Sequence, residues 1–145
     1  MNNRNLNTRG AILAGAAALG FAMFGGLGTA QAGVEMCQLR IDVVEADLNL
    51  TADGNDCAGV VIGGNNIDRT CASLNSKLDS ASRKLDEVKL EDAYVDLSNF
   101  VDKVLDLDTP NAKGETKIAD GSTPVDQLIV DAEAARDCVG GLLGL

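Results

Sequence analysis

Four cysteines are the residues whose number and spacing suggest the most definite chemistry. They are Cys37, Cys57, Cys71 and Cys138. Their spacing contains no Cys-x-x-Cys pair and the chain has no histidine, so they do not match the usual ligand sets of zinc. An even number of cysteines is typical of disulfide-bonded exported chains. We therefore predict two disulfides and no metal site at the cysteines.

Acidic residues, 22 in all against 12 lysines and arginines, are the other groups with catalytic potential. A glycosidase needs two carboxyl groups facing each other across a cleft, usually beside aromatic side chains that bind sugar rings. Because the chain has no tryptophan and one tyrosine, we interpret its acidic pairs as solvated helix faces. The pairs considered are Glu91 with Asp92, Asp102 with Asp106, and Asp131 with Glu133.

The absence of histidine also excludes the common Ser-His-Asp and Cys-His mechanisms. No catalytic residue and no cofactor-binding residue is therefore predicted. A small hydrolase that uses acidic residues alone is the third of three functional hypotheses, behind an interaction module and an enzyme inhibitor.

The segment Asp53-Gly54-Asn55-Asp56 is the best candidate for a cation-binding turn. It does not match a calcium loop, because Cys57 occupies the fifth position and no glutamate stands at the twelfth. Asp-Gly is a common turn pair, so an ordinary turn is the favoured interpretation. Asp106, Asp108 and Asp120 could form a second oxygen cluster. No metal ligand is predicted from either set.

Two short motifs carry less weight. Asn49-Leu50-Thr51 is a glycosylation sequon, but nothing else in the sequence indicates a eukaryotic source, and modification is not predicted. Gly63-Gly64 lacks the strand, helix and lysine that accompany a phosphate-binding loop.

Residues 1–32 have the pattern of a cleavable secretory signal. Arg4 and Arg9 lie in a polar start without acidic residues, and residues 11–28 carry no charge. Ala30 and Ala32 then supply the small-x-small exit that a signal peptidase requires. We predict cleavage between Ala32 and Gly33. The competing interpretation, a membrane anchor, is weaker because repeated glycines dilute the apolar run.

Export by the general secretory route predicts a secreted or periplasmic protein. Cleavage removes two arginines, so the net charge of −10 would become −12. Such a surface repels nucleic-acid phosphates and anionic lipid headgroups. We therefore expect no nucleic-acid partner, no membrane association after cleavage, and an extracellular protein or cell-wall component as partner.

The elements that position these residues are four predicted helices, over residues 35–50, 70–88, 91–107 and 124–139. Thr70 is expected to cap the second helix. In the fourth, Thr123 is expected to cap, Pro124 to take the first helical position, and the Gly140-Gly141 pair to end the helix. Apolar residues recur every three or four positions in each segment. In the last three helices, the positions predicted to be buried are Leu74, Leu78, Ala81, Leu85, Val88, Ala93, Leu97, Phe100, Val101, Val104, Val125, Leu128, Ile129, Ala132 and Ala135.

The first predicted helix allows two interpretations. Met36, Leu39, Val43, Ala46 and Leu50 form a helical stripe, which we predict to face the core. The alternation of Cys37, Leu39, Ile41 and Val43 with polar residues instead suits a strand. The helical pattern extends over more of the segment, so a helix is favoured.

Four such helices predict an all-α fold, a small antiparallel three- to four-helix bundle forming one domain over residues 33–145. If successive helices alternate in direction, Cys37 and Cys138 lie at one end of the bundle and Cys57 and Cys71 at the other. We therefore predict the disulfides Cys37–Cys138 and Cys57–Cys71.

The core pattern of residues 74–139 resembles the FIMAH domain, a small helical module of bacterial secreted and surface proteins. The resemblance implies a helical interaction or accessory module outside the cell, and no catalytic residues. This chain departs from that domain in its first helix and its four cysteines. The residues that carry the resemblance are Leu74, Leu78, Ala81, Leu85, Ala93, Leu97, Phe100, Val104, Leu128, Ile129 and Ala132.

A second likeness is one of layout alone. Plant inhibitors of pectin methylesterase and invertase are also four-helix bundles with four cysteines, which makes a secreted enzyme inhibitor the alternative hypothesis.

Overall fold

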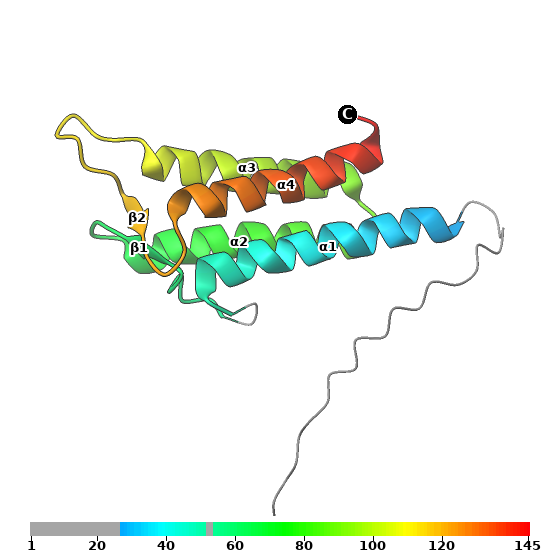
Figure 1. Ribbon diagram of the computed structural model, residues 1–145, viewed down its shortest axis with the longest axis horizontal. Coiled ribbons are helices and arrows are strands. Elements are labelled where there is room, and N and C mark those ends of the chain that lie inside the picture. Colours follow the sequence, from blue (N-terminus) through cyan, green and yellow to red (C-terminus); the bar gives the residue numbers. More distant parts are fainter. Residues whose placement is uncertain (1–26, 52–53) are drawn as a thin grey trace, which may run out of the picture.

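The computed structural model describes residues 27–51 and 54–145 of the 145-residue chain. In these residues the fold is a bundle of four helices with one small antiparallel sheet (Figure 1). This confirms the predicted all-α bundle; the sheet was not predicted. The elements are α1 (Leu27–Asn49), β1 (Val60–Ile62), α2 (Ile67–Asp86), α3 (Leu90–Asp108), β2 (Ile118–Asp120) and α4 (Val125–Leu143).

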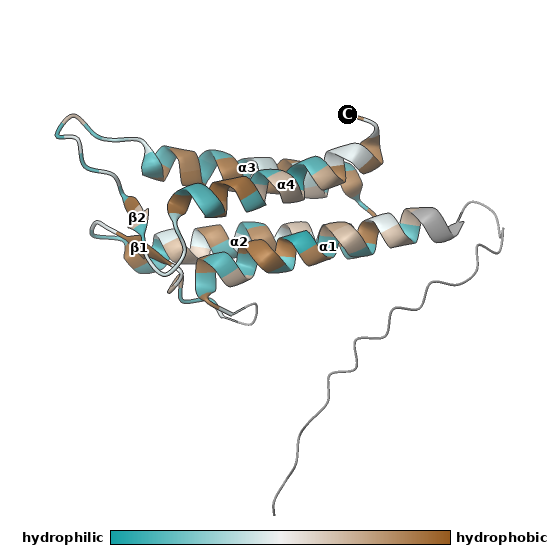
Figure 2. Ribbon diagram, in the orientation of Figure 1, coloured by the Kyte–Doolittle hydropathy of each residue, from teal (hydrophilic) through white to brown (hydrophobic). Residues whose placement is uncertain are grey.

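The helices form two layers, with α3 and α4 lying over α2 and α1 (Figure 1). Helix α1 packs mainly against α4, α4 against α3, and α3 against α2, whereas the contact between α1 and α2 is smaller. Hydrophilic and hydrophobic residues alternate along all four helices in Figure 2, as expected for helices that bury one face each.

Helices α2, α3 and α4 bury nearly all of the residues predicted from their periodicity. Phe100 is the largest fully buried side chain in a core built otherwise from leucine, valine, isoleucine, alanine and disulfide-bonded cysteine. Two predictions are wrong: Val88 is exposed, and Ile129 is only partly buried. The core residues of these helices include Leu74, Leu78, Ala81, Leu85, Ala93, Leu97, Phe100, Val101, Val104, Val125, Leu128, Ala132 and Ala135.

Helix α1 is oriented differently from the prediction. The residues that face the core are Cys37, Ile41, Val44 and Leu48, each fully buried. The stripe predicted to be buried lies on the outer face instead, and the prediction of its burial is wrong. Both stripes have three- and four-residue spacing, so periodicity alone does not choose between them. The disulfide at Cys37 holds the inner stripe against α4.

Helix α1 also begins earlier than expected, at Leu27 and not near residue 35. Alanine and glutamine at residues 30–32 favour helix, and the predicted cleavage site between Ala32 and Gly33 therefore falls within α1. Residues 1–26, which hold most of the predicted signal, lie outside the described residues.

The ends of α2 differ from the prediction. The helix begins at Ile67, three residues before Thr70, and Asn66 at its N-cap makes no side-chain capping bond. Thr70 is thus inside the first turn, where its N–H donates to the Asn66 carbonyl (2.9 Å). The helix ends at Asp86, and Val88 follows with φ +58°, a left-handed conformation that a β-branched residue rarely adopts.

Helix α4 is capped by a residue other than the predicted one. Pro124 takes the N-cap position, and Asp120 Oδ1 accepts a hydrogen bond from the Val125 N–H (2.9 Å). Thr123 instead donates its own N–H to the Gly59 carbonyl (2.8 Å). The prediction that Thr123 caps the helix is therefore wrong, because the carboxylate of the preceding strand reaches the helix terminus.

The predicted stop at Gly140-Gly141 is also wrong, since α4 continues to Leu143. A Cβ atom at Gly140 would lie 3.2 Å from Tyr94 Cε2, so this glycine allows α3 and α4 to approach closely. The helix ends before Gly144, whose φ of +77° is the left-handed conformation common after helices.

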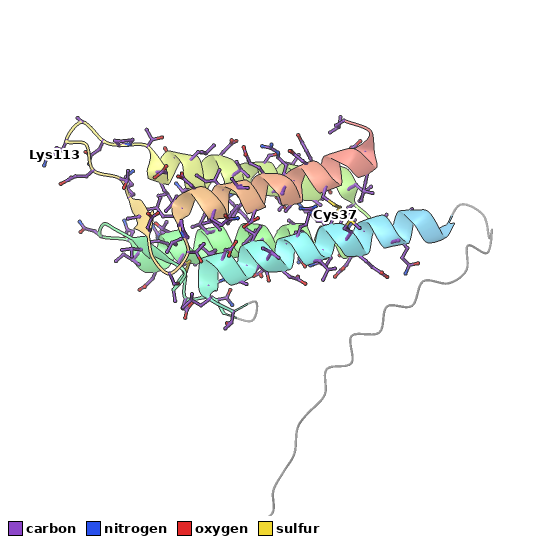
Figure 3. All side chains as sticks on the ribbon, in the orientation of Figure 1. Cys37 and Lys113 are labelled. Carbon is purple, nitrogen blue, oxygen red and sulfur yellow. A yellow bond between two sulfur atoms is a disulfide. The ribbon has the colours of Figure 1, made fainter. Side chains whose placement is uncertain are left out.

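Both predicted disulfides are present. Cys37 and Cys138 join α1 to α4 with a Cα–Cα distance of 5.5 Å, and Cys57 and Cys71 join the loop after α1 to α2 at 5.8 Å. Figure 3 labels Cys37 where α1 lies beside α4, and Lys113 in the loop between α3 and β2. The pairing follows from alternating helix directions, as predicted.

The two strands close one end of the bundle. Val60 pairs with Asp120 and Ile62 with Ile118, and the buried side chains of Val60, Ile62 and Ile118 extend the core. Gly59 donates its N–H to the Leu48 carbonyl (2.8 Å). A Cβ atom at Gly59 would lie 1.7 Å from the Asp47 carbonyl oxygen, so only glycine permits this approach.

Candidate functional site

The outer face of α1 carries a row of apolar side chains that the bundle leaves uncovered. We call this row the α1 outer stripe; it consists of Met36, Leu39, Val43, Ala46 and Leu50. The exposed fractions are 60% for Met36, 65% for Leu39, 48% for Val43 and 52% for Leu50. Contiguous exposed apolar side chains on a folded protein are typical of an interaction surface.

The spacing of the α1 outer stripe alternates between three and four residues over its full length. This is the a/d spacing of a coiled-coil seam, in which apolar side chains pack into the holes of a facing helix. At 1.5 Å per residue the helical part of the stripe, residues 36–46, runs for roughly 15 Å. Leu50 extends it beyond the last residue of α1 and has φ +65°.

Charged side chains flank the α1 outer stripe on both sides. By helical spacing, Arg40 and Asp47 lie along one flank, toward α4, and Glu35 and Asp42 along the other. Gln38 Nε2 bridges from the second flank to α2 by donating to Asp42 Oδ1 (3.2 Å) and Ser82 Oγ (2.7 Å). The flanks are thus acidic overall, with one arginine.

An acidic pair links α1 and α4 beside the stripe. Asp47 on α1 faces Asp131 on α4, and in the described part of the chain no donor reaches Asp47 Oδ2, which is buried. Burial, followed by the hydrogen bond and negative charge of Asp131, raises the pKa of Asp47 to about 6. Asp131 Oδ2 also accepts from Gln127 Nε2 (2.6 Å). Two carboxyl groups are thus brought close together, which favours the protonated form of Asp47.

The sequon residue Asn49 has a structural role. It is 2% exposed, and its Nδ2 donates to Asn75 Oδ1 (2.6 Å). Its Oδ1 accepts from the Cys57 N–H (2.9 Å) and from Asn75 Nδ2 (3.2 Å). Glycosylation would attach a sugar to the buried Nδ2, so the sequon is used for internal hydrogen bonding. Sequence reasoning missed this pair, although Asn75 follows the core residue Leu74 directly.

A hollow of about 450 Å³ lies beside the Cys57–Cys71 disulfide. It includes two residues of the turn considered as a cation candidate, Asn55 and Asp56; Asp53 lies outside the described residues. Over residues 27–51 and 54–145, no three histidine, cysteine, aspartate or glutamate side chains gather closely enough to hold a metal ion. The hollow is lined by Asn55, Asp56, Ile67, Asp68, Cys71, Ala72, Asn75, Ser76 and Asp79.

The acidic pairs considered for catalysis are dispersed. Glu91 and Asp92 are exposed in the first turn of α3, and Asp102 and Asp106 are exposed on the same helix. Asp106 pairs with Lys103 at 3.4 Å.

Asp131 faces α1, so it does not act together with Glu133 as a pair. Asp120 is engaged at the start of α4 and does not form a three-carboxylate cluster with Asp106 and Asp108. The structure therefore brings together Asp47 and Asp131, which sequence reasoning did not pair.

No family model, no curated protein and no solved structure matches the chain. Within the described residues, none of the helices combines the length and apolarity needed to cross a bilayer.

Proposed function

We propose that this protein is an exported, non-enzymatic interaction module that presents the outer face of α1 to an extracellular protein or a cell-wall component. The observation that carries the proposal is the α1 outer stripe, because apolar side chains in a row are costly to expose unless a partner covers them. The Cys37–Cys138 disulfide supports it by holding the helix that bears the stripe in one orientation against α4.

The acidic pairs support a binding role over a catalytic one. On α3 all four carboxylates are exposed on one and the same helix. The resemblance of residues 74–139 to the FIMAH domain implies the same kind of role, an interaction or accessory module outside the cell.

The proposed route is secretion with removal of residues 1–32, and the disulfides are consistent with an oxidising compartment. Cell fractionation and N-terminal sequencing of the processed protein test this part. We expect a sequence that begins at Gly33. An unprocessed, cytoplasmic chain with reduced cysteines would contradict export.

Site-specific photo-crosslinking tests the interaction surface. A benzophenone side chain in place of Leu39 should capture a partner from the compartment in which the protein resides. The matched control is Val95 on α3, which is 54% exposed against 65% for Leu39. Adducts at position 39 and not at position 95 are expected, and equal labelling at both positions would refute the proposal.

The same experiment addresses the alternative function. The bundle of four helices with two disulfides has the layout of the plant inhibitors named above. If the captured protein is an enzyme, its activity should be measured with the purified module added. Inhibition that depends on Leu39 would make this an inhibitor that uses the same surface.

A further inference from the structure

The geometry of the α1 outer stripe indicates which kind of secondary structure could cover it. Within the helix its apolar positions recur with alternating three- and four-residue steps from Met36 to Ala46. Side chains in that arrangement leave holes that accept the apolar side chains of a second α-helix. A β-strand or an extended peptide would match period two, which the stripe does not have.

The charge around the stripe indicates which charge a bound partner should carry. Helices α1 and α4, which pack side by side, together carry eight acidic residues and two arginines in their sequences. The whole chain has a net charge of −10. A facing helix with lysine or arginine beside its apolar positions would be attracted to the flank of Glu35 and Asp42 and steered toward this acidic part of the surface.

A second copy of this chain fits less well. Two copies would bring equal negative charges together, and at the flanks Glu35, Asp42 and Asp47 outnumber Arg40. The contact would also be limited to one helix face of roughly 15 Å, whereas stable interfaces bury about 1,200–2,000 Å². A small contact of this kind depends on favourable electrostatics, which only a basic occupant supplies.

We infer that the α1 outer stripe binds a basic amphipathic α-helix of a protein partner. The inference rests on the proposed function, since it names the class of partner for the surface proposed there. Met36, Leu39 and Val43 supply the apolar contacts, and Glu35 and Asp42 on the acidic flank pair with lysine or arginine of the bound helix.

A synthetic peptide of about 20 residues, long enough to form helix on the stripe, serves as the probe. It carries leucine at the a and d positions, lysine at the e and g positions, and a fluorophore for anisotropy. Two control peptides are needed. One has the same composition in shuffled order, which keeps the charge and removes the stripe; the other replaces each lysine by glutamate.

We expect the oxidised, exported protein to bind the leucine–lysine peptide at least tenfold more tightly than either control. Val43→Ser should weaken this binding at least fivefold. Val130→Ser on α4 is the matched control, because Val130 is 56% exposed against 48% for Val43. Thermal unfolding of both variants establishes that each remains folded.

Equal binding of the shuffled peptide would overturn the inference, since charge alone would then explain the binding. Equal loss in Val43→Ser and Val130→Ser would overturn it as well. A dimer in sedimentation equilibrium that Val43→Ser dissociates would assign the stripe to a second copy. Absence of peptide binding together with crosslinks at position 39 would overturn the partner class and leave the proposed function intact. Absence of both would remove the proposed function itself.

Discussion

Replacing Asp47 by asparagine should make this protein more stable at neutral pH and leave its stability in acid nearly unchanged. Asp47 and Asp131 face each other between α1 and α4, and the pKa of Asp47 is raised from its ordinary value of 3.8 to about 6. Between these two pH values the folded state binds more protons than the unfolded state. The stability contributed by the protonated pair is therefore present below pH 4 and is lost as the pH rises through 6.

The expected gain in stability follows from the size of the change in the pKa of Asp47. The difference between 3.8 and about 6 corresponds to at most about 3 kcal/mol. Because the pair is only partly buried, solvent screening reduces the expected effect to about 1 kcal/mol. The asparagine amide would donate to Asp131 without titrating itself and would remove the charge repulsion.

The assay is urea unfolding followed by circular dichroism, with the disulfides intact, at several pH values between 4 and 8. The free energy of unfolding of Asp47→Asn should exceed that of the parent protein by about 1 kcal/mol at pH 7.5. This difference should vanish near pH 4. Asp102→Asn removes the same charge from the exposed face of α3 and controls for net charge. A difference between Asp47→Asn and the parent that does not vary with pH would refute the reasoning.

Three further predictions concern stability. Replacing Cys57 and Cys71 by serine should cost about 3 kcal/mol in chemical unfolding, the chain-entropy value for a loop of this size; an unchanged midpoint would contradict a closed bridge. Asn75→Ala should cost about 1–3 kcal/mol in the same assay, because it leaves the buried Asn49 amide without its partner. Val88→Gly should raise the stability by about 1 kcal/mol, since Val88 is 66% exposed and has φ +58°; a lower melting temperature would show that this conformation is not strained.

The buried face could be predicted from sequence for the helices with one apolar row. It could not be predicted for α1, which has two such rows. In α2, Leu74, Leu78 and Leu85 form the only continuous apolar row, so its buried face follows directly from periodicity. In α1 the inner and outer rows are equally regular. The one indication in the sequence was Cys37, because a disulfide to the last helix requires its row to face inward.

The remaining differences arise from contacts between residues distant in sequence. Asp120 caps α4 because the pairing of β1 with β2 brings its carboxylate to Val125. The Asn49–Asn75 hydrogen bond and the Asp47–Asp131 pair both join different helices. Local propensity and periodicity carry no information on such pairs, whereas the disulfide pairing depended only on helix direction and could be derived.

The Cys37–Cys138 bridge determines how this domain would respond to mechanical force. A pull applied to chain outside these two residues passes through one covalent bond between α1 and α4, whose Cα atoms are 5.5 Å apart. The chain between the two cysteines, which are 101 residues apart in sequence, is thereby shielded from tension. Helices α2 and α3 and both strands lie in this part of the chain and carry no load. Under oxidising conditions the domain would act as a nearly inextensible link, and reduction would allow it to lengthen.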